Sequence, residues 1–272
     1  METRIYVITV SFNDLDGLKE TINSVDSQNH DDIFHIIIDG GTKNFKEILE
    51  MQRIRNAIYV TEPDGGIYDA MNKGLSYCQE GIVCWLNSSD VYESENTLSR
   101  VNESFLKNDW LWAYGAMKFS RSRETREDIN WQYPFNSFLL AFGFRWIPHP
   151  STFYHTRLIS QLQKYDEAIE IASDQDFILR ASKIALPQYL PFVCVTMKPG
   201  GTHTSLSGLD RERIWQKIRK KNGRLLFHSL LADNIFVLIS PIFVKLFYLY
   251  QATWNRLVIK RDLIDSVRKF KE

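Results

Sequence analysis

The sequence has few cysteines, and they lack the spacing of a metal or redox site. Only Cys78, Cys84 and Cys194 are cysteine among 272 residues, and they form no C-x-x-C pair. This absence excludes a disulfide-stapled scaffold and a zinc ribbon, and thiols among apolar neighbours are typical of core residues in a reducing compartment. Met1 and residues 2–4 do not match a secretory signal, so we expect a cytoplasmic protein.

The glycine-rich phosphate loops of two common enzyme classes are also missing. After the first strand-like run, residues 11–17 read SFNDLDG, without the G-x-G-x-x-G of dinucleotide-binding enzymes. The same turn lacks the Gly- and Arg-rich loop that a sugar nucleotidyltransferase needs there. The sequence therefore argues against a dehydrogenase and against a nucleotidyltransferase.

The chain as a whole has no excess of either charge, but its C-terminal part is basic and the remainder is acidic. The chain has 33 basic and 33 acidic residues, yet residues 210–272 hold 14 basic and 6 acidic ones. An acidic body with a basic tail indicates one part for chemistry and another for attachment. The tail has no nucleic-acid motif, so we expect a membrane surface as its partner. We predict a catalytic domain over 1–208 and a basic amphipathic helical tail over 209–272.

Strand and helix patterns alternate through the first hundred residues. Apolar positions at helical spacing lie between β-branched runs, and a further helix is expected over Asp174–Ile184. This alternation predicts an α/β fold with a mainly parallel sheet covered on both faces. The aromatic-rich stretch Trp110–Phe144 is expected to form a meander and loops. The expected strands are Arg4–Ser11, Phe34–Ile38, Ala57–Thr61 and Ile82–Leu86.

Polar residues follow each of these four strands. The strand ends are followed by SFND, DGG, EPDGG and NSSD segments, so acidic and glycine residues recur at one expected sheet edge. Ligands of such sheets bind outside the carboxyl ends of the strands. One Asp after a strand is usually a cap or turn residue, but four such segments together indicate a binding site.

The ordered motifs resemble a known family. EPDGGIYDAMNKG over 62–74, followed by LNSSD over 86–90, is similar to family 2 glycosyltransferases of the GT-A fold, in the branch of bacterial capsule and exopolysaccharide assembly. The resemblance spans 4–205. It implies a GT-A sheet flanked by helices and an inverting enzyme. The implied substrates are a nucleotide-diphosphate sugar, by default a UDP-sugar, and a glycan or lipid-linked acceptor. Further motifs in order are VSFN, IDGGT, HPSTF, SDQDF and GGT.

The resemblance implies where the donor binds. Asp39 is expected to accept hydrogen bonds from the base or ribose, and the backbone at Ser11 to flank the base. Asp64 is a nucleoside contact or a turn cap, two alternatives that the sequence leaves open. Asn87 and Ser89 complete the expected contacts to the nucleotide sugar.

Asp90 is the expected ligand of Mg²⁺ or Mn²⁺. Both ions take hard oxygen ligands, commonly one or two carboxylates together with phosphate oxygens. Such an ion neutralises the leaving diphosphate. The family usually has an Asp immediately before this position, whereas this chain has Ser89. His203 is a secondary candidate for the metal or the diphosphate.

Asp174 inherits the role of general base from the resemblance, because a carboxylate beside the acceptor hydroxyl can take its proton. The alternative is that Ser173 or Asp174 only caps the following helix. Asp176 is expected to be structural or to position the acceptor. His149 is a structural residue or part of the acceptor pocket.

The tail contains an apolar run, Leu225–Tyr250, with basic residues on both sides. Asp233 and Lys245 leave 11 uncharged residues between them, fewer than a membrane span needs, and Pro241 is expected to kink or stop a helix. The run is an interfacial membrane anchor or a surface that packs on the domain or on a second subunit. An inactive partner subunit is the alternative to an enzyme.

Overall fold

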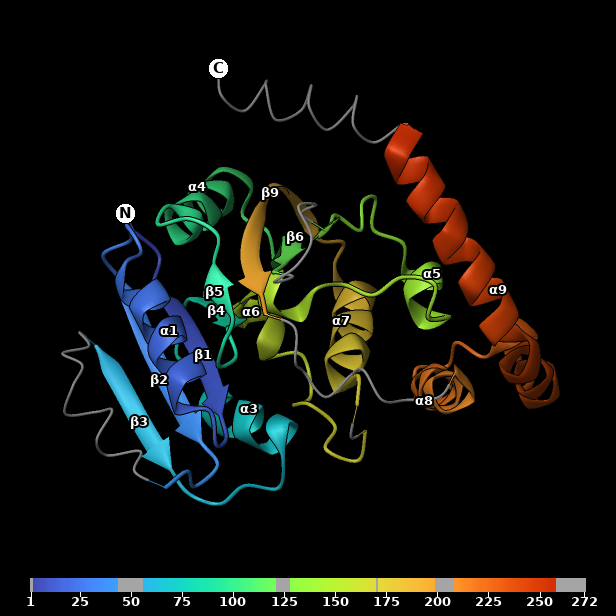
Figure 1. Ribbon diagram of the computed structural model, residues 1–272, viewed down its shortest axis with the longest axis horizontal. Helices are drawn as coiled ribbons and strands as arrows, with labels where there is room; N and C mark the ends of the chain where they lie inside the picture. Colours follow the sequence, from blue (N-terminus) through green and yellow to red (C-terminus); the bar gives the residue numbers. More distant parts are fainter. Residues whose placement is uncertain (1, 44–55, 121–127, 170, 199–207, 258–272) are drawn as a thin grey trace.

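The computed structural model describes residues 2–43, 56–120, 128–169, 171–198 and 208–257 (Figure 1). Within these residues nine strands form one sheet in the order β3-β2-β1-β4-β8-β6-β9-β5, with β7 paired to β6. The strands are β1 (Ile5–Ser11), β2 (Ile33–Asp39), β3 (Ala57–Thr61), β4 (Ile82–Trp85), β5 (Val91–Tyr92), β6 (Trp112–Phe119), β7 (Asp128–Asn130), β8 (Thr152–His155) and β9 (Gln188–Met197).

Helices connect the strands and continue beyond the last one. The described α-helices are α1 (Leu15–Asp26), α3 (Ile67–Leu75), α4 (Thr97–Asn108), α5 (Ser137–Ala141), α6 (Thr156–Ile159), α7 (Ser173–Ile184), α8 (Gly208–Lys221) and α9 (Leu230–Leu257). Two 3₁₀ turns, η1 (His149–Ser151) and η3 (Leu226–His228), complete the assignment. Figure 1 shows α9 running along the outside of the body, at the opposite end from β3.

The first half of the sheet is parallel, as the sequence predicts. β1 pairs in parallel with β2 on one side and β4 on the other, and β3 pairs in parallel with β2. The second half is mixed: β8 is antiparallel to β4 and β6, while β6 is parallel to β9. The α/β fold class and the four expected strands are confirmed, with ends that differ by one residue.

The expectation of a meander and loops over Trp110–Phe144 misses one feature: β6 forms an antiparallel pair with β7, as in a meander, but also enters the main sheet. β6 occupies an interior position of the sheet, between β8 and β9. Its residues from Trp112 to Met117 are all buried. A strand buried on both faces has no alternation of apolar and polar residues, so the period-two signal of a strand is missing.

Apolar cores cover both faces of the sheet. Side chains of β1 alternate between them, since Tyr6 and Ile8 belong to one core and Ile5 and Val7 to the other. The first core includes residues of α3, α7 and α8, and the second includes residues of α1 and α4. Helices on both faces leave the carboxyl ends of the strands as the open edge.

Helix α8 packs as part of the catalytic body. Its Trp215 and Ile218 lie in the first core together with residues of α7. Gly143 has φ +70°, and a Cβ there would lie 2.8 Å from the Trp215 ring, so glycine permits the close approach of α8. The predicted boundary at residue 208 is therefore crossed by core packing.

Pro241 does not interrupt α9, contrary to the sequence expectation. Proline cannot donate to the carbonyl four residues earlier, which here is Val237 O. The Ser240 hydroxyl donates to that oxygen at 3.3 Å and so replaces the missing donor. The helix continues through both residues for 28 residues in all.

Asp233 also fails to break the apolar surface of α9. It turns inward and pairs with Arg219 of α8 at 2.9 Å, and both side chains have no exposed surface. The segment Leu230–Phe247 is long and apolar enough to cross a membrane by length and composition, with mean hydropathy 1.9 and 22% of it buried. This segment still contains Asp233 and Lys245, so the uncharged run between them is 11 residues long, as the sequence indicates.

Candidate active site

The ends of β1 to β4 meet at one edge of the sheet. In the parallel register Ser11 lies opposite Asp39, and Asp39 lies opposite Thr61. On the other side of β1, Ser88 N donates to Val10 O at 3.1 Å, which brings the segment after β4 beside the end of β1. The predicted convergence of the four polar segments is thus present in the structure.

Three polar groups at this edge have no hydrogen-bond partner among the described residues. Ser11 Oγ and Asn87 Oδ1 are buried and have no hydrogen-bond partner among the described residues. The Asp90 carboxylate likewise receives no hydrogen bond from the described part of the chain, and the residue is 5% exposed. Buried polar atoms are normally paired, so this cluster is typical of a place where a ligand supplies the missing partners.

Asp90 combines a fixed backbone with an unpaired carboxylate. Its N–H donates to Asn87 O at 3.0 Å, and its carbonyl accepts from Thr21 Oγ1 at 2.8 Å. Burial raises the pKa of the Asp90 carboxyl to about 8, because no neighbouring charge or donor offsets the loss of water. A bound cation would offset this loss.

The chemistry of Asp90 fits a divalent cation that is shared with a phosphate ligand. In the described ranges His, Cys, Asp and Glu side chains do not gather in groups of three or more, so these residues do not form a complete metal cage. Mg²⁺ commonly takes one or two carboxylates and fills its other positions with water and phosphate. His203, the secondary candidate, lies outside the described residues.

Ser89 contacts the protein itself through its side chain. Its hydroxyl donates to Asp14 Oδ2 at 2.9 Å, and Ser88 donates to the same oxygen at 2.8 Å. Burial alone would raise the pKa of Asp14, but these hydrogen bonds and that from Gly17 N outweigh it and lower the pKa. The geometry thus favours a structural role for Ser89 over the predicted donor contact. An Asp at position 89 would place a second carboxylate beside Asp14.

Asp39 is buried and orders the loop that follows β2 at this edge. It has no exposed surface, and its carboxylate accepts from Thr42 N at 2.7 Å, Thr42 Oγ1 at 2.6 Å, Gly41 N at 3.0 Å and Thr61 Oγ1 at 3.0 Å. These donors satisfy both oxygens. The carboxylate thus orders the loop that a ligand would meet, and the contact between Asp39 and a base or ribose stays a prediction.

Phe12 and Asp64 flank that loop. The Phe12 ring is 65% exposed although it follows a fully buried strand. A Cβ on Gly40 would lie 2.9 Å from both the Phe12 ring and Asp64 Oδ2, so the two side chains stand close to the loop backbone. Asp64 Oδ1 accepts from Gly66 N at 2.9 Å, which makes Asp64 a turn residue with one remaining oxygen. Sequence reasoning missed Phe12, whose signal is an aromatic directly after a buried strand.

Asp174 lies in the first turn of α7 and does not cap it. The N-cap position is Ala172, with no side-chain cap, so the capping alternative is wrong. Asp174 Oδ1 accepts from Tyr68 OH at 3.1 Å, and Oδ2 accepts from Gln175 Nε2 at 2.9 Å. Burial and the nearby Asp174 carboxylate raise the pKa of Tyr68 well above its usual range, so its hydroxyl remains a donor. The half-buried Asp174 carboxylate is held in one orientation from two sides.

His149 and Asp176 are both buried in protein contacts. His149 Nε2 is 2.8 Å from Tyr165 OH, and its ring centroid lies 5.3 Å from that of Trp85. Asp176 has no exposed surface and is paired with Arg180 and Lys221. These contacts within the described residues favour the structural alternatives, and the acceptor contacts of both residues stay predictions.

Comparison with known proteins places this edge in context. Residues 6–168 match the family model described as glycosyl transferase family 2. An uncharacterized glycosyltransferase of Mycobacterium tuberculosis is 34% identical over 243 residues, which cover 85% of this chain and 91% of that protein.

Two solved structures share the fold. S. aureus TarS 1-349 in complex with UDP has a TM-score of 0.65 at 16% identity, and the match covers 81% of this chain and 65% of the 1-349 chain. The mannosyltransferase PcManGT from Pyrobaculum calidifontis, in complex with GDP-Man and Mn²⁺, has a TM-score of 0.62 at 13% identity, covering 100% and 80%. This chain thus spans less than two thirds of the TarS chain.

We predict that Asp90→Asn stabilises the cation-free protein at alkaline pH. The folded pKa of about 8 exceeds the usual Asp value, so ionisation of Asp90 opposes folding. Wild-type stability should therefore fall relative to the variant as pH rises from about 4 to about 8, by at most about 1.4 kcal/mol per pH unit. Urea unfolding of both proteins in EDTA at several pH values measures this difference.

The same pair of proteins tests the cation. Mn²⁺ with UDP should stabilise the wild type and leave Asp90→Asn unchanged. A stability difference that does not vary with pH, or an equal response of both proteins to Mn²⁺, would contradict the role of Asp90.

Proposed function

Because the chain belongs to glycosyltransferase family 2, we propose that it is an inverting glycosyltransferase that uses a nucleoside-diphosphate sugar. The acceptor is a hydroxyl of a glycan or lipid-linked sugar, in the synthesis of a cell-surface polysaccharide on the cytoplasmic side. The unpaired cluster Ser11, Asn87 and Asp90 is the single observation that carries this proposal. It offers hydroxyl, amide and carboxylate oxygens where a diphosphate and a cation need ligands.

The nucleoside is proposed to lie on the rim formed by Phe12 and Asp64. An exposed aromatic ring is a stacking surface for any base, and the remaining Asp64 oxygen can accept a hydrogen bond from the base or ribose. The presence of UDP in one structural neighbour and GDP-Man in another supports a nucleotide donor. We favour a UDP-sugar.

Asp90 would hold Mg²⁺ or Mn²⁺ against the diphosphate, with phosphate oxygens and water as further ligands. When bound, the cation supplies positive charge that stabilises the leaving diphosphate. The enzyme's own contribution is the buried carboxylate on a fixed backbone.

Asp174 is proposed to be the general base. The acceptor oxygen attacks the anomeric carbon, its proton passes to Asp174, and the bond from that carbon to the diphosphate oxygen breaks. One displacement inverts the anomeric configuration. The hydrogen bonds from Tyr68 and Gln175 hold the carboxylate in place.

The alternative is a catalytically inactive partner subunit. Ser89 in place of an Asp motivates this alternative, but its hydroxyl is used by Asp14 and leaves Asp90 unaffected. Release of nucleoside diphosphate from UDP-glucose, UDP-galactose, UDP-GlcNAc and GDP-mannose with Mn²⁺ distinguishes the two. An inactive subunit releases none above the rate without protein.

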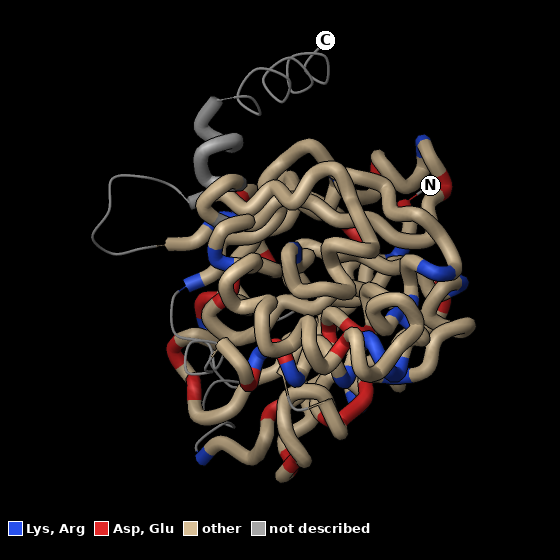
Figure 2. The backbone as a smooth tube through the Cα atoms, turned by 90° about the vertical axis from the view of Figure 1, so that its right-hand side faces the viewer, with Lys and Arg blue, Asp and Glu red and all other residues tan. Residues whose placement is uncertain are grey.

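We propose that α9 attaches the enzyme peripherally to an anionic membrane surface. Phe236 packs on Phe142 at 5.2 Å between ring centroids, and Phe247 packs on Phe144 at 5.2 Å, so α9 lies along the body. Most of its exposed residues are apolar, with Asn234 and Lys245 among them as polar exceptions. Figure 2 is viewed from the side of the molecule on which α9 lies. The exposed side chains include Leu231, Ile235, Leu238, Ile242, Phe243, Leu246 and Leu249.

Helix α8 supplies the charge for this attachment. Its exposed cations include Arg211, Arg213, Lys217 and Lys220. Apolar helix surface beside Lys and Arg is the combination that binds anionic leaflets. A lipid-linked acceptor would be presented at the same surface.

Asp174→Asn should lower the transfer rate by about 10²- to 10⁴-fold, because it removes the proton acceptor. Affinity for UDP should stay at the wild-type value, since the change affects the reacting centre alone. Diphosphate release and calorimetric titration with UDP and Mn²⁺ measure the two quantities. Asp109→Asn, an exposed carboxylate beside Arg157, is the control and should retain both. Wild-type turnover in Asp174→Asn would refute the assignment of Asp174 as the general base.

Phe12→Ala should weaken UDP binding by about tenfold or more, because stacking on a base contributes about 1–3 kcal/mol. Phe12→Tyr should retain the affinity of the wild type. Titration calorimetry gives the dissociation constants. Phe138→Ala removes another exposed ring, on α5, and should change nothing. Equal affinities for Phe12→Ala and Phe138→Ala would place the base elsewhere.

Leu238→Glu/Ile242→Glu should abolish co-flotation with vesicles of phosphatidylglycerol and phosphatidylethanolamine, because acidic residues replace the exposed apolar face of α9. Leu106→Glu/Leu186→Glu, which changes two exposed leucines on other surfaces by the same charge, should still float. The membrane proposal is wrong when the wild type stays in the bottom fraction, or when both double variants behave alike.

A further inference from the structure

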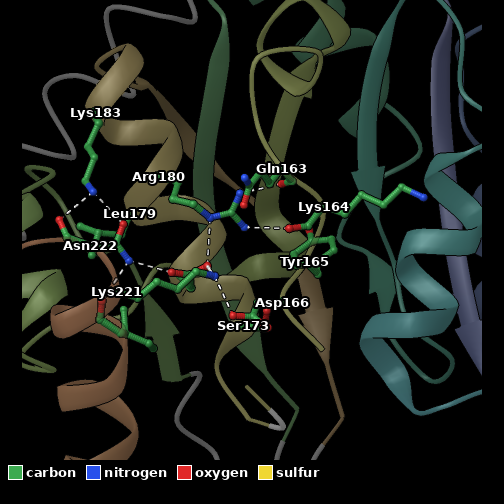
Figure 3. A network of polar contacts seen from close by, with 12 residues as sticks. Gln163, Lys164, Tyr165, Asp166, Ser173, Leu179, Arg180, Lys183, Lys221 and Asn222 are labelled. Atoms are coloured by element: carbon green, nitrogen blue, oxygen red, sulfur yellow. Dashed lines mark hydrogen bonds and ion pairs between the residues drawn. The ribbon is translucent and has the colours of Figure 1, made fainter. Parts of the chain in front are cut away.

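Asp176 links the first turn of α7 to the end of α8. Its Oδ1 accepts from Asn222 Nδ2 at 2.7 Å, and its Oδ2 accepts from Lys221 Nζ and Arg180 Nε, each at 2.9 Å. Figure 3 shows Arg180, Lys221 and Asn222 turned toward one another between the two helices. Asp176 has no exposed surface, so this carboxylate depends on its three protein partners.

The cations of this junction also hold the segment before α7. Arg180 donates to Gln163 O at 2.6 Å and to Lys164 O at 3.0 Å. Lys221 pairs with Asp166 at 2.8 Å. The junction therefore ties α8 to α7 and also to residues 163–166, as the dashed lines in Figure 3 indicate.

A second contact joins the C-terminal end of α7 to Asn222, the residue that also bonds Asp176. Lys183 Nζ donates to both Asn222 O and Asn222 Oδ1 at 2.8 Å. Asn222 thus contacts α7 near its start, through Asp176, and near its end, through Lys183. This residue follows α8 directly and is buried.

The first turn of α7 is consequently fixed from three directions. Tyr68 OH accepts from Ser173 N and donates to Asp174. Gln175 exchanges two hydrogen bonds with the backbone of Ile147. Asp176 faces α8. Residues two apart on a helix point about 200° apart, so the contact of Asp176 with α8 sets how far the Asp174 carboxylate projects on the opposite side.

We infer that Asp176, Lys221 and Asn222 form a positioning junction through which the C-terminal helices hold Asp174 in its reactive place. This inference rests on the proposed function of Asp174 as the base. Helix α8 then contributes to catalysis by positioning Asp174, in addition to its proposed role in membrane attachment. Misplacing a catalytic group by about 1 Å can cost about a hundredfold in rate.

Exchange of the two junction residues provides the test. Asn222→Asp puts a carboxylate against that of Asp176, and we expect kcat to fall about tenfold to a hundredfold. KM for the donor and the dissociation constant of UDP should not change, because the edge at β1 and β4 is untouched. The double variant Asp176→Asn/Asn222→Asp restores an amide–carboxylate pair and should recover kcat to within about threefold of the wild type.

The measurement is diphosphate release from the donor panel with Mn²⁺, together with UDP titration and thermal unfolding of the full chain. Gln216→Asp is the matched control: Gln216 is an amide on α8 whose side chain bonds Asn234 of α9, away from α7. It should keep wild-type kcat. Should Asn222→Asp unfold, Lys221→Met and Lys221→Arg serve instead, and only the arginine variant should retain turnover.

The outcomes separate the junction from the reaction. No diphosphate release by the wild type overturns both proposals. Release by the wild type together with unchanged kcat in Asn222→Asp overturns the junction alone. A low kcat that the double variant does not restore also overturns it, because Asp176 would then act by its own chemistry. Loss of UDP affinity in parallel with kcat would indicate general damage to the fold and contradict positioning.

Discussion

Parallel pairing of β1 with β2 on one side and β4 on the other is the constraint on which the site depends. Because these strands point the same way, the polar residues that follow them are carried to one edge. Ser11, Asn87 and Asp90 meet there with side-chain atoms that receive no hydrogen bond within the described chain. An unsatisfied buried polar group costs about 1–3 kcal/mol, so the cores on both faces must offset this cost. A ligand that provides the missing partners recovers the same free energy as binding.

The acidic residues of the chain fall into two groups when their partners are considered. Asp39 and Asp176 have every oxygen satisfied by protein donors and no exposed surface, and they order the loop and the helix around them. Asp90 and Asp174 keep capacity for a ligand, Asp90 because it is unpaired and Asp174 because it is half-buried. Asp174 also accepts one hydrogen bond at each oxygen, so its exposure, and not the number of its donors, distinguishes it from Asp39 and Asp176.

Sequence patterns could predict the first half of the fold, because each of its strands and helices is marked by a pattern within its own residues. β-branched runs that end in polar segments define β1 to β4, and apolar residues at helical spacing define α1 and α3. The interior strand β6 has no such pattern, since it is buried on both faces. The structural role of Asp176 is one of the two that the sequence offers, but its partners could not be predicted. Lys221 and Asn222 are 45 and 46 residues away, in a segment that the charge pattern assigns to a separate tail.

Helix α9 combines buried polar residues with an exposed apolar surface. Its Asp233 and Ser240 have no exposed surface, whereas Leu238 and Ile242 are 69% and 66% exposed. The inward polar groups are satisfied, Asp233 by Arg219 and by Leu226 N, and Ser240 by the carbonyl that Pro241 leaves without a donor. Val237 and Val244 are buried beside these polar groups, so α9 packs on the body with one apolar stripe and leaves a second apolar stripe exposed. The buried contacts of Asp233 with α8 then fix the orientation of this exposed stripe relative to α7, because α8 is bonded to α7 through Lys221 and Asn222.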